Sequence, residues 1–437
     1  MLAYSKLRKL HRGLYALPAF VLALPTIPVF VLMPTFYAET MGLGLASVGL
    51  IFLGLRLLDV ISDPLIGYIS DQISSHYGRR KLPMAVGAVI GAPALIMLFS
   101  PSPGISPIYL IGWGAILYLA WTAVQIPYVS WAVELENEYV ARAQLNGYRE
   151  GAGLLGIMAT GAAGVLLVSN TEQERFQVLA WVTVFLGIVV FYLTLRFVPN
   201  GRSTRAKKSK GLSFPWYNGI FLRVLTAWFL NGLANGLPAV CLPLFMTHIL
   251  GASERDQAVL LFIYFLSAVI GIPAWVWLSK IYAKHSVWCL SMTMACVVFL
   301  TVPLLSAGDI YAFGLVCILT GITLGSDLTL PPAIQADCAD WDCFRYHKHR
   351  TGTLFAYWSM STKLALGLAV GFAFPVLSWA GLDDQTQTAS FQSKMVLIVI
   401  YAMIPIVLKS ISIILMKNFR IGPKQHQAIS RRLESRK

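Results

Sequence analysis

Three charged residues interrupt an apolar segment of the chain. Arg56, Asp59 and Asp63 all fall within the stretch RLLDVISDPLIG. On a helix, acids four residues apart share one face, so the two carboxylates of this stretch lie near each other. Two close carboxylates cannot both stay ionised at low cost, and the pair takes up a proton or a cation unless another counter-charge arrives. The spacing therefore predicts a proton or cation switch.

Hydroxyl groups could complete such a site. Na+ is a hard ion, and by extension from Ca2+ and Mg2+ it prefers oxygen ligands. Ser62 and Thr122 are the hydroxyl residues that we expect to supply them. A structural interpretation stays open beside this one. In it, the two acids pair with Arg56, Arg149 or Lys363 and only hold the helices together.

Further charges lie in apolar surroundings, where a charged side chain is costly and is a functional candidate by default. Lys363, in SMSTKLALGLAVGF, could neutralise the carboxylates when no cation is bound, anchor a substrate, or form a packing ion pair. Arg149 could form an inner-gate ion pair or contact substrate. Asp327 could be a proton site or a structural hydrogen-bond partner. Three basic residues lie close enough to segment ends for their side chains to snorkel to the interface: Arg196, Arg223 and Lys409.

The composition predicts that membrane-spanning helices position these residues. Of the 437 residues, 57% are hydrophobic and 12% are charged, and the mean hydropathy is +0.67, far more apolar than an average soluble domain. Apolar runs of about 20 residues recur along the chain without the alternation of a β-barrel strand. The predicted fold is all-α. The expected spans are 14–38, 45–70, 83–101, 108–133, 146–168, 177–198, 218–249, 257–279, 286–306, 309–335, 352–378 and 394–416.

Basic residues gather on one side of this predicted topology. They precede the first span, follow the second at Arg79, Arg80 and Lys81, and fill the segments 199–217 and 417–437. The positive-inside rule then places both termini in the cytoplasm, which requires an even number of spans. Because the net charge of +14 is explained in this way, we expect no nucleic-acid partner.

The polar linker 199–217 separates two predicted six-helix bundles, 1–198 and 218–416, and 417–437 forms a basic cytoplasmic tail. The hairpin after the second span weakly resembles the hairpin after the eighth, which indicates parallel repeats. Prolines inside several spans predict kinks.

We expect no cleavable signal peptide, and the six cysteines and seven histidines form no convincing disulfide framework, metal centre or catalytic cluster. The protein is therefore not expected to be an enzyme.

Several ordered blocks resemble one transporter family over essentially the whole chain. They are YAETMGL at 37–43, the R-x-x-D-x-x-x-D-P-x-x-G pattern from Arg56 to Gly67, SDQISSHYGRRK, IPYVSW at 126–131, AQLNGYREGAGLLG, and the segment 337–371. Together they resemble the glycoside-pentoside-hexuronide:cation symporters, the melibiose-permease branch of the major facilitator superfamily (MFS).

The resemblance implies twelve transmembrane helices in two bundles that work by alternating access. It carries cation binding onto Asp59 and Asp63, with Thr122 as a hydroxyl ligand and Ser62 where melibiose permeases have an Asn. It carries sugar-site or gating roles onto Arg149 and Lys363, with Lys363 coupling the two sites. The remaining charges to which we assign gating or structural roles are Arg56, Asp71, Arg79, Arg80, Asp327, Asp337 and Asp340.

The chain departs from the family at both acidic sugar anchors. Gln125 and Ala23 stand where melibiose permeases have aspartates, and an amide plus a methyl group cannot accept the same sugar hydrogen bonds. Trp358 and Ser359 could supply an aromatic platform and a hydroxyl near Lys363. A related eukaryotic branch moves lysolipids with a comparable cation site, so a less polar substrate competes with a sugar.

The sequence thus predicts a monomeric, multi-pass protein of the cell inner membrane. We expect a secondary symporter of a glycoside-like solute, coupled to Na+ or H+ and without another cofactor or metal; its partners are the solute and membrane lipid. The alternative is a transporter or flippase of a lysolipid or other amphiphile.

Overall fold

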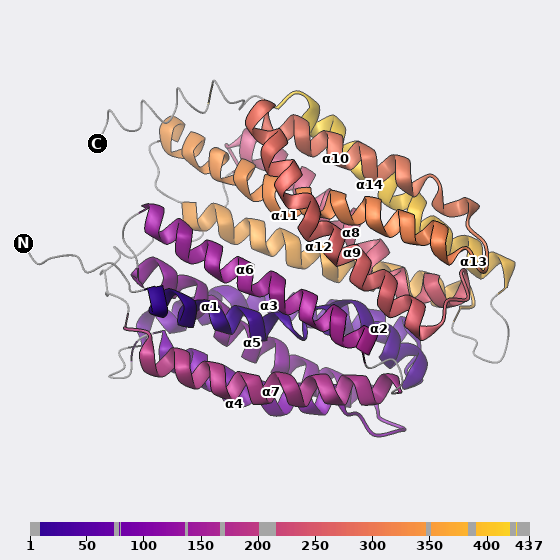
Figure 1. Ribbon diagram of the computed structural model, residues 1–437, viewed down its shortest axis with the longest axis horizontal. Coiled ribbons are helices and arrows are strands. Elements are labelled where there is room, and N and C mark those ends of the chain that lie inside the picture. Colours follow the sequence, from indigo (N-terminus) through magenta and orange to yellow (C-terminus); the bar gives the residue numbers. More distant parts are fainter. Residues whose placement is uncertain are drawn as a thin grey trace, which may run out of the picture. The chain divides into compact units, whose positions relative to one another are not determined.

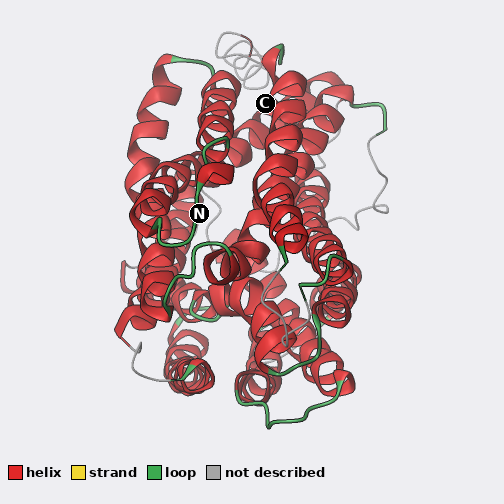
Figure 2. Ribbon diagram, turned by 90° about the vertical axis from the view of Figure 1, so that its right-hand side faces the viewer, coloured by secondary structure: helices red, strands yellow, loops and turns green. Residues whose placement is uncertain are grey.

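All regular structure in the described ranges is helical (Figure 2). The computed structural model describes residues 9–73, 78, 80–135, 139–166, 171–200, 216–346, 351–382, 390–419 and 425. The elements are α1 (Lys9–Ala23), η1 (Pro28–Leu32), α2 (Met33–Thr35), η2 (Phe36–Thr40), α3 (Leu45–Gln72), α4 (Lys81–Phe99), α5 (Pro107–Leu135), α6 (Tyr139–Leu166), α7 (Glu172–Phe197), α8 (Gly219–His248), α9 (Glu254–Ile281), α10 (Lys284–Phe299), η3 (Val302–Leu304), α11 (Ile310–Tyr346), α12 (Thr351–Trp379), α13 (Phe391–Ile398), η4 (Val399–Met403) and α14 (Ile404–Lys417). The all-α prediction is confirmed.

Eleven helical segments in the described part of the chain are long and apolar enough to cross a membrane. Each corresponds to one of the predicted spans. The remaining predicted span, 146–168, falls in α6, which has 28 residues and a more polar composition. At 1.5 Å per residue α6 measures about 42 Å, which is enough to cross a bilayer. The protein is a multi-pass membrane protein.

The chain forms two compact units, Met1–Lys208 and Ser209–Lys437, here called the N-terminal and C-terminal units. Figure 1 shows their long helices with the two units in different colours, indigo to magenta and then pink to yellow. Both units are built in the same way, from long helices whose apolar side chains pack against one another.

In the N-terminal unit α1 packs against α6 and α7, and α5 packs against α3 and α4. Buried hydroxyl groups join these helices by donating to backbone carbonyls of a neighbour. Tyr15 donates to the carbonyl of Tyr128 on α5 at 2.9 Å, and Thr160 on α6 donates to the carbonyl of Leu24 at 2.7 Å. The apolar core around them includes Trp131. These bonds satisfy polar groups that the hydrocarbon of a membrane could not.

Close contact of α1 with α6 requires a glycine. A Cβ added at Gly156 would lie 2.9 Å from the Cβ of Ala23 and would overlap the carbonyl oxygen of Phe20. Small residues allow membrane helices to approach closely enough for extensive van der Waals contact.

In the C-terminal unit α8 packs against α12 and α14, α9 against α11, and α10 against α11 and α14. Indole groups cross these contacts: Trp275 donates to the carbonyl of Ile322 at 2.7 Å, and Trp228 donates to the hydroxyl of Thr362 at 2.7 Å. The fully buried Trp288 lies in the apolar core of this unit. These contacts hold the helices that carry the polar residues described below.

Some of the prolines change the helical geometry. The first span, Leu10–Thr40, becomes a π-helix at Pro28 and again at Phe36. Proline lacks the amide hydrogen that an α-helix needs, which explains a change of hydrogen-bond pattern at Pro28. By contrast, α5 and α11 continue through Pro127 and Pro331.

Candidate functional site

Asp59 and Thr122 form a buried contact in the N-terminal unit. The Thr122 hydroxyl on α5 donates a 2.8 Å hydrogen bond to Oδ1 of Asp59 on α3. Asp59 is 5% exposed and Thr122 is 1% exposed. The structure therefore brings together two of the residues that the sequence predicted as cation ligands.

Arg56 lies one turn before Asp59 and beside the same carboxylate. Its Nη1 is 3.6 Å from Asp59 Oδ2, beyond hydrogen-bond range. The guanidinium carbon lies 3.9 Å from the ring centroid of Phe30 and 5.2 Å from that of Tyr118. Aromatic faces attract a cation, so these rings hold the guanidinium beside Asp59. The structural interpretation of Asp59, an ion pair with Arg56, is thus present in this geometry.

Ser62 and Asp63 extend the polar face of α3. The buried Ser62 hydroxyl donates to the backbone carbonyl of Asp59 at 3.1 Å, and Asp63 is half-buried. Since Ser62 and Thr122 both act as hydrogen-bond donors, their oxygen lone pairs stay available to a cation. A monovalent cation bound to these oxygens would lower the negative charge of the two carboxylates.

A second buried polar cluster lies in the C-terminal unit. The ammonium of Lys409 on α14 donates to Oδ1 of Asn231 at 2.8 Å and to Oδ1 of Asn235 at 2.7 Å, and it lies 3.9 Å from Oδ2 of Asp327. Lys409 is 2% exposed. The expectation that Lys409 snorkels is wrong, because three polar residues on α8 and α11 surround its ammonium inside the unit.

Asp327 has two neutral donors of its own. Its Oδ2 accepts a 2.7 Å hydrogen bond from Asn235 Nδ2, and its Oδ1 accepts one of 2.7 Å from Trp288 Nε1. Asp327 is therefore hydrogen-bonded, as the structural interpretation expected. It also lies beside a cation that the sequence interpretation had not connected with it.

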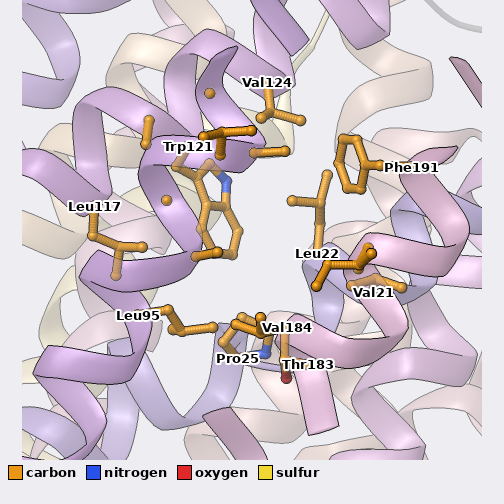
Figure 3. Close-up of a pocket in the computed structure, with 18 of the residues that line it drawn as sticks. Val21, Leu22, Pro25, Leu95, Leu117, Trp121, Val124, Thr183, Val184 and Phe191 are labelled. Carbon is orange, nitrogen blue, oxygen red and sulfur yellow. The ribbon is translucent and has the colours of Figure 1, made fainter. Parts of the chain in front are cut away.

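An apolar cavity of about 440 Å3 lies in the N-terminal unit between α1, α4, α5 and α7. Figure 3 shows Leu22, Trp121 and Phe191 around it. Thr183 also lines the cavity, and its hydroxyl is buried without a hydrogen-bond partner among the described residues. A space so bounded suits a hydrocarbon chain better than a sugar, because sugar hydroxyls would lose their hydrogen bonds there.

A family model described as MFS/sugar transport protein matches residues 14–422. The chain belongs to the MFS/sugar transport family. The predicted resemblance to melibiose-permease-like symporters is confirmed at this level.

Some curated relatives of this MFS/sugar transport protein are named as lysophosphatidylcholine symporters, and others are bacterial proteins named as a symporter or an isoprimeverose transporter. The sodium-dependent lysophosphatidylcholine symporter 1 of Homo sapiens is 23% identical over 431 residues, covering 88% of this chain and 78% of the relative. The inner membrane symporter YicJ of Escherichia coli is 23% identical over 407 residues, covering 90% and 87%. The isoprimeverose transporter of Lactiplantibacillus pentosus is 23% identical over 447 residues, covering 95% and 90%.

Solved structures support the MFS fold. A mutant of the nucleoside transporter NupG superposes with a TM-score of 0.69 at 16% identity, covering 93% of this chain and all of that one. A bacterial homologue of the human lysosomal transporter Spinster, inward-facing and unoccupied, gives 0.65 at 14% identity, covering 95% and 100%. At these identities the likeness concerns the fold alone.

The residues to which the resemblance gave substrate roles lie in different surroundings. Arg149 forms a 2.6 Å ion pair with the adjacent Glu150 on α6. Gln125 is half-buried on α5, whereas Ala23 is buried against Gly156. The helix contact at Ala23 leaves little space for a longer side chain.

In the C-terminal unit, Trp358 on α12 stacks on Trp228 of α8, with ring centroids 4.6 Å apart and planes 11° apart. Trp358 is buried, and one face of its ring is covered by the indole of Trp228. Lys363 is half-buried on α12, and Ser359 is exposed. Trp358 and Lys363 lie on the same helix, as expected from the sequence, but the partner ring of Trp228 on α8 was not predicted.

Two ion pairs join helix ends of this MFS protein. Arg80 contacts Glu134 on α5 at 2.7 Å and donates to the Ser70 hydroxyl at 2.9 Å. In the C-terminal unit the ammonium of Lys284 donates to both carboxylate oxygens of Asp337 at 2.8 Å. These contacts fit the structural roles expected of Arg80 and Asp337.

The other predicted gating charges add less. Asp340 is half-buried on α11. Asp71 lies in the last turn of α3, but its side chain is outside the described residues, as is the whole of Arg79.

Several polar and aromatic residues of these clusters were not predicted from the sequence. The missed residues are Glu134, Trp228, Asn231, Asn235 and Trp288. A sequence signal existed for Asn231 and Asn235, because NGLAN places two amides four residues apart in an apolar helix.

Proposed function

We propose that this protein is a cation-coupled symporter of a glycoside-like solute. The observation that carries the proposal is the buried contact of Asp59 with Thr122, with Asp63 one turn further along α3. It joins carboxylate and hydroxyl oxygens, the ligand type that a hard cation prefers. Relatives named as symporters, including YicJ, support the same activity.

Na+ is the coupling ion that the site favours over H+. A proton needs one carboxylate oxygen, whereas Na+ needs several oxygen ligands. Thr122 and Ser62 lie where their hydroxyl oxygens can add to those of Asp59. Relatives named as sodium-dependent symporters agree with this choice.

The transport cycle follows from charge. A cation bound between Asp59 and Asp63 would lower the negative charge of the two carboxylates. A site with less net charge costs less to keep buried when the protein changes conformation. We propose that binding of cation and solute together permits the change to the opposite-facing state, with both termini remaining on the cytoplasmic side.

An amphiphile such as a lysolipid is the second candidate substrate. The apolar cavity between α1, α4, α5 and α7 favours it. So does the replacement of both acidic sugar anchors, at Ala23 and Gln125. In this version the cation site is unchanged and only the solute differs.

Uptake into proteoliposomes tests both the coupling ion and the substrate class. Labelled glycosides and labelled lysophosphatidylcholine would be offered under an inward Na+ gradient, an inward H+ gradient, or neither. We expect Na+-driven uptake of one substrate class, and its loss in Asp59→Asn and in Asp63→Asn. The control is Asp309→Asn, an exposed acid before α11. Full coupled uptake by both site variants would contradict the proposal.

A further inference from the structure

The surroundings of Lys409 are those of a bound cation. Its ammonium faces the carbonyl oxygens of Asn231 and Asn235, at 2.8 and 2.7 Å, and a carboxylate oxygen of Asp327, at 3.9 Å. An ammonium group can only donate, so both amides must direct their oxygens toward it. The three acceptors come from α8 and α11, and the cation comes from α14.

The positive charge of Lys409 sets the orientation of the Asn231 amide. Asn231 is fully buried, and its Nδ2 has no hydrogen-bond partner among the described residues. A buried amide donor without a partner is unfavourable. Turning the amide over would place that donor against the ammonium, so the amide keeps its oxygen on the cation instead.

A packing role alone explains the cluster poorly. Burying an ion pair is often no better for stability than apolar residues of the same volume. Lys409 is near the end of the last span, and its long side chain could reach the interface. It is instead turned inward and held by two amides and one acid.

We propose that the Lys409 ammonium is a tethered cation that permanently occupies a monovalent-cation site formed by Asn231, Asn235 and Asp327. The C-terminal unit then needs no mobile ion at this position. This inference concerns a different site from the one proposed for symport, and its test requires no transport.

The test removes the tethered charge and asks whether a free cation replaces it. The full chain would carry Lys409→Met in a background of Asp59→Asn and Asp63→Asn, so that the N-terminal site cannot respond. Thermal unfolding of the purified protein would be measured in LiCl, NaCl or KCl. N-methylglucamine chloride would keep the ionic strength equal.

We expect the background protein to unfold at the same temperature in every salt. Adding Lys409→Met should make the midpoint rise with the concentration of at least one alkali cation, as binding to the folded state requires. Adding Asp327→Asn to that variant should abolish the rise. A Lys409→Met protein that behaves alike in alkali and N-methylglucamine salts would overturn the proposal.

Loss of folding would also be informative. If Lys409→Met cannot be recovered in N-methylglucamine chloride but is recovered in an alkali chloride, the proposal is supported. If no salt recovers it, Lys409→Ala would be extracted with methylammonium or tetramethylammonium chloride. Recovery with methylammonium alone supports the proposal, because only the smaller ion donates hydrogen bonds. Failure with both refutes it.

Discussion

The Thr122 hydroxyl donates a 2.8 Å hydrogen bond to Asp59 Oδ1, and this bond joins α5 to α3 at a buried point. The residue that completes the proposed cation site is therefore also the residue that orients its carboxylate. A change at Thr122 tests the site without removing a charge.

We expect Thr122→Val to weaken Na+ binding by about tenfold or more, which corresponds to about 1.4 kcal/mol. Valine has a similar shape but no oxygen for the cation or hydrogen for Asp59. Thr122→Ser keeps the hydroxyl and should stay within about threefold of the wild type. The Na+ concentration for half-maximal uptake would show this. Equal values for Thr122→Val and the wild type would argue against a cation site at Asp59.

Arg56→Gln should make the stability of the protein depend on Na+. The change leaves Asp59 buried without its neighbouring cation, and a buried charge that loses its partner destabilises a protein by about 3–5 kcal/mol. A bound Na+ would restore part of this. Thermal unfolding with and without Na+ measures the effect, and Arg56→Lys is the control that keeps the charge. A loss of stability in Arg56→Gln that does not depend on Na+ would favour a purely structural role for the Arg56–Asp59 ion pair.

The two helix-end ion pairs should differ in strength. The side chains of Arg80 and Glu134 are 9% and 12% exposed, whereas that of Lys284 is 36% exposed. We expect Arg80→Gln to destabilise the protein by about 3 kcal/mol or more, and Lys284→Gln by about 1 kcal/mol or less. Thermal unfolding midpoints would rank them. The opposite order would show that burial does not set the strength of these pairs.

Gly156→Ala should disturb the contact of α1 with α6. Its added Cβ would meet the Cβ of Ala23 at 2.9 Å, and overpacking of this kind costs about 1–3 kcal/mol. Gly147→Ala is the matched control on the same helix, because nothing lies within 4 Å of its added Cβ. The unfolding midpoint should fall only for Gly156→Ala. Equal midpoints for the two variants would mean that α1 and α6 separate at little cost.

Val184→Phe should separate the two candidate substrates. Val184 lines the apolar cavity, so a larger ring would occupy part of it. If the cavity holds an acyl chain, binding of labelled lysophosphatidylcholine should fall by about tenfold while the Na+ dependence of stability stays unchanged. Val182→Phe, on the exposed side of α7, is the control. Unchanged lysolipid binding in Val184→Phe would remove the cavity as support for an amphiphile.

The sequence was sufficient to predict the helices and part of the proposed cation site. Spans of apolar residues have to satisfy their backbone internally, which leaves little choice but helices. The spacing of Asp59 and Asp63 was readable because it lies within one helix. Thr122, 63 positions after Asp59, was proposed from its hydroxyl and from resemblance, since helical periodicity says nothing of contacts between helices.

Lys409 shows where such reasoning fails. Its place near the end of a span predicted an interfacial side chain, but α8 presents two amides to it inside the unit. The depth of a residue depends on which neighbour its helix packs against, and that is a tertiary property. The cavity could not be predicted for the same reason, because four helices have to meet before it exists.

The ion pairs Arg80–Glu134 and Lys284–Asp337 share one position in their respective units. In each, a basic residue beginning one helix meets an acid near the end of the next long helix, α4 with α5 and α10 with α11. The residue types differ, with a long base and a long acid in one unit and shorter counterparts in the other. A gene duplication would explain this correspondence, because the ancestral ion pair would persist in both units after the surrounding sequence had diverged.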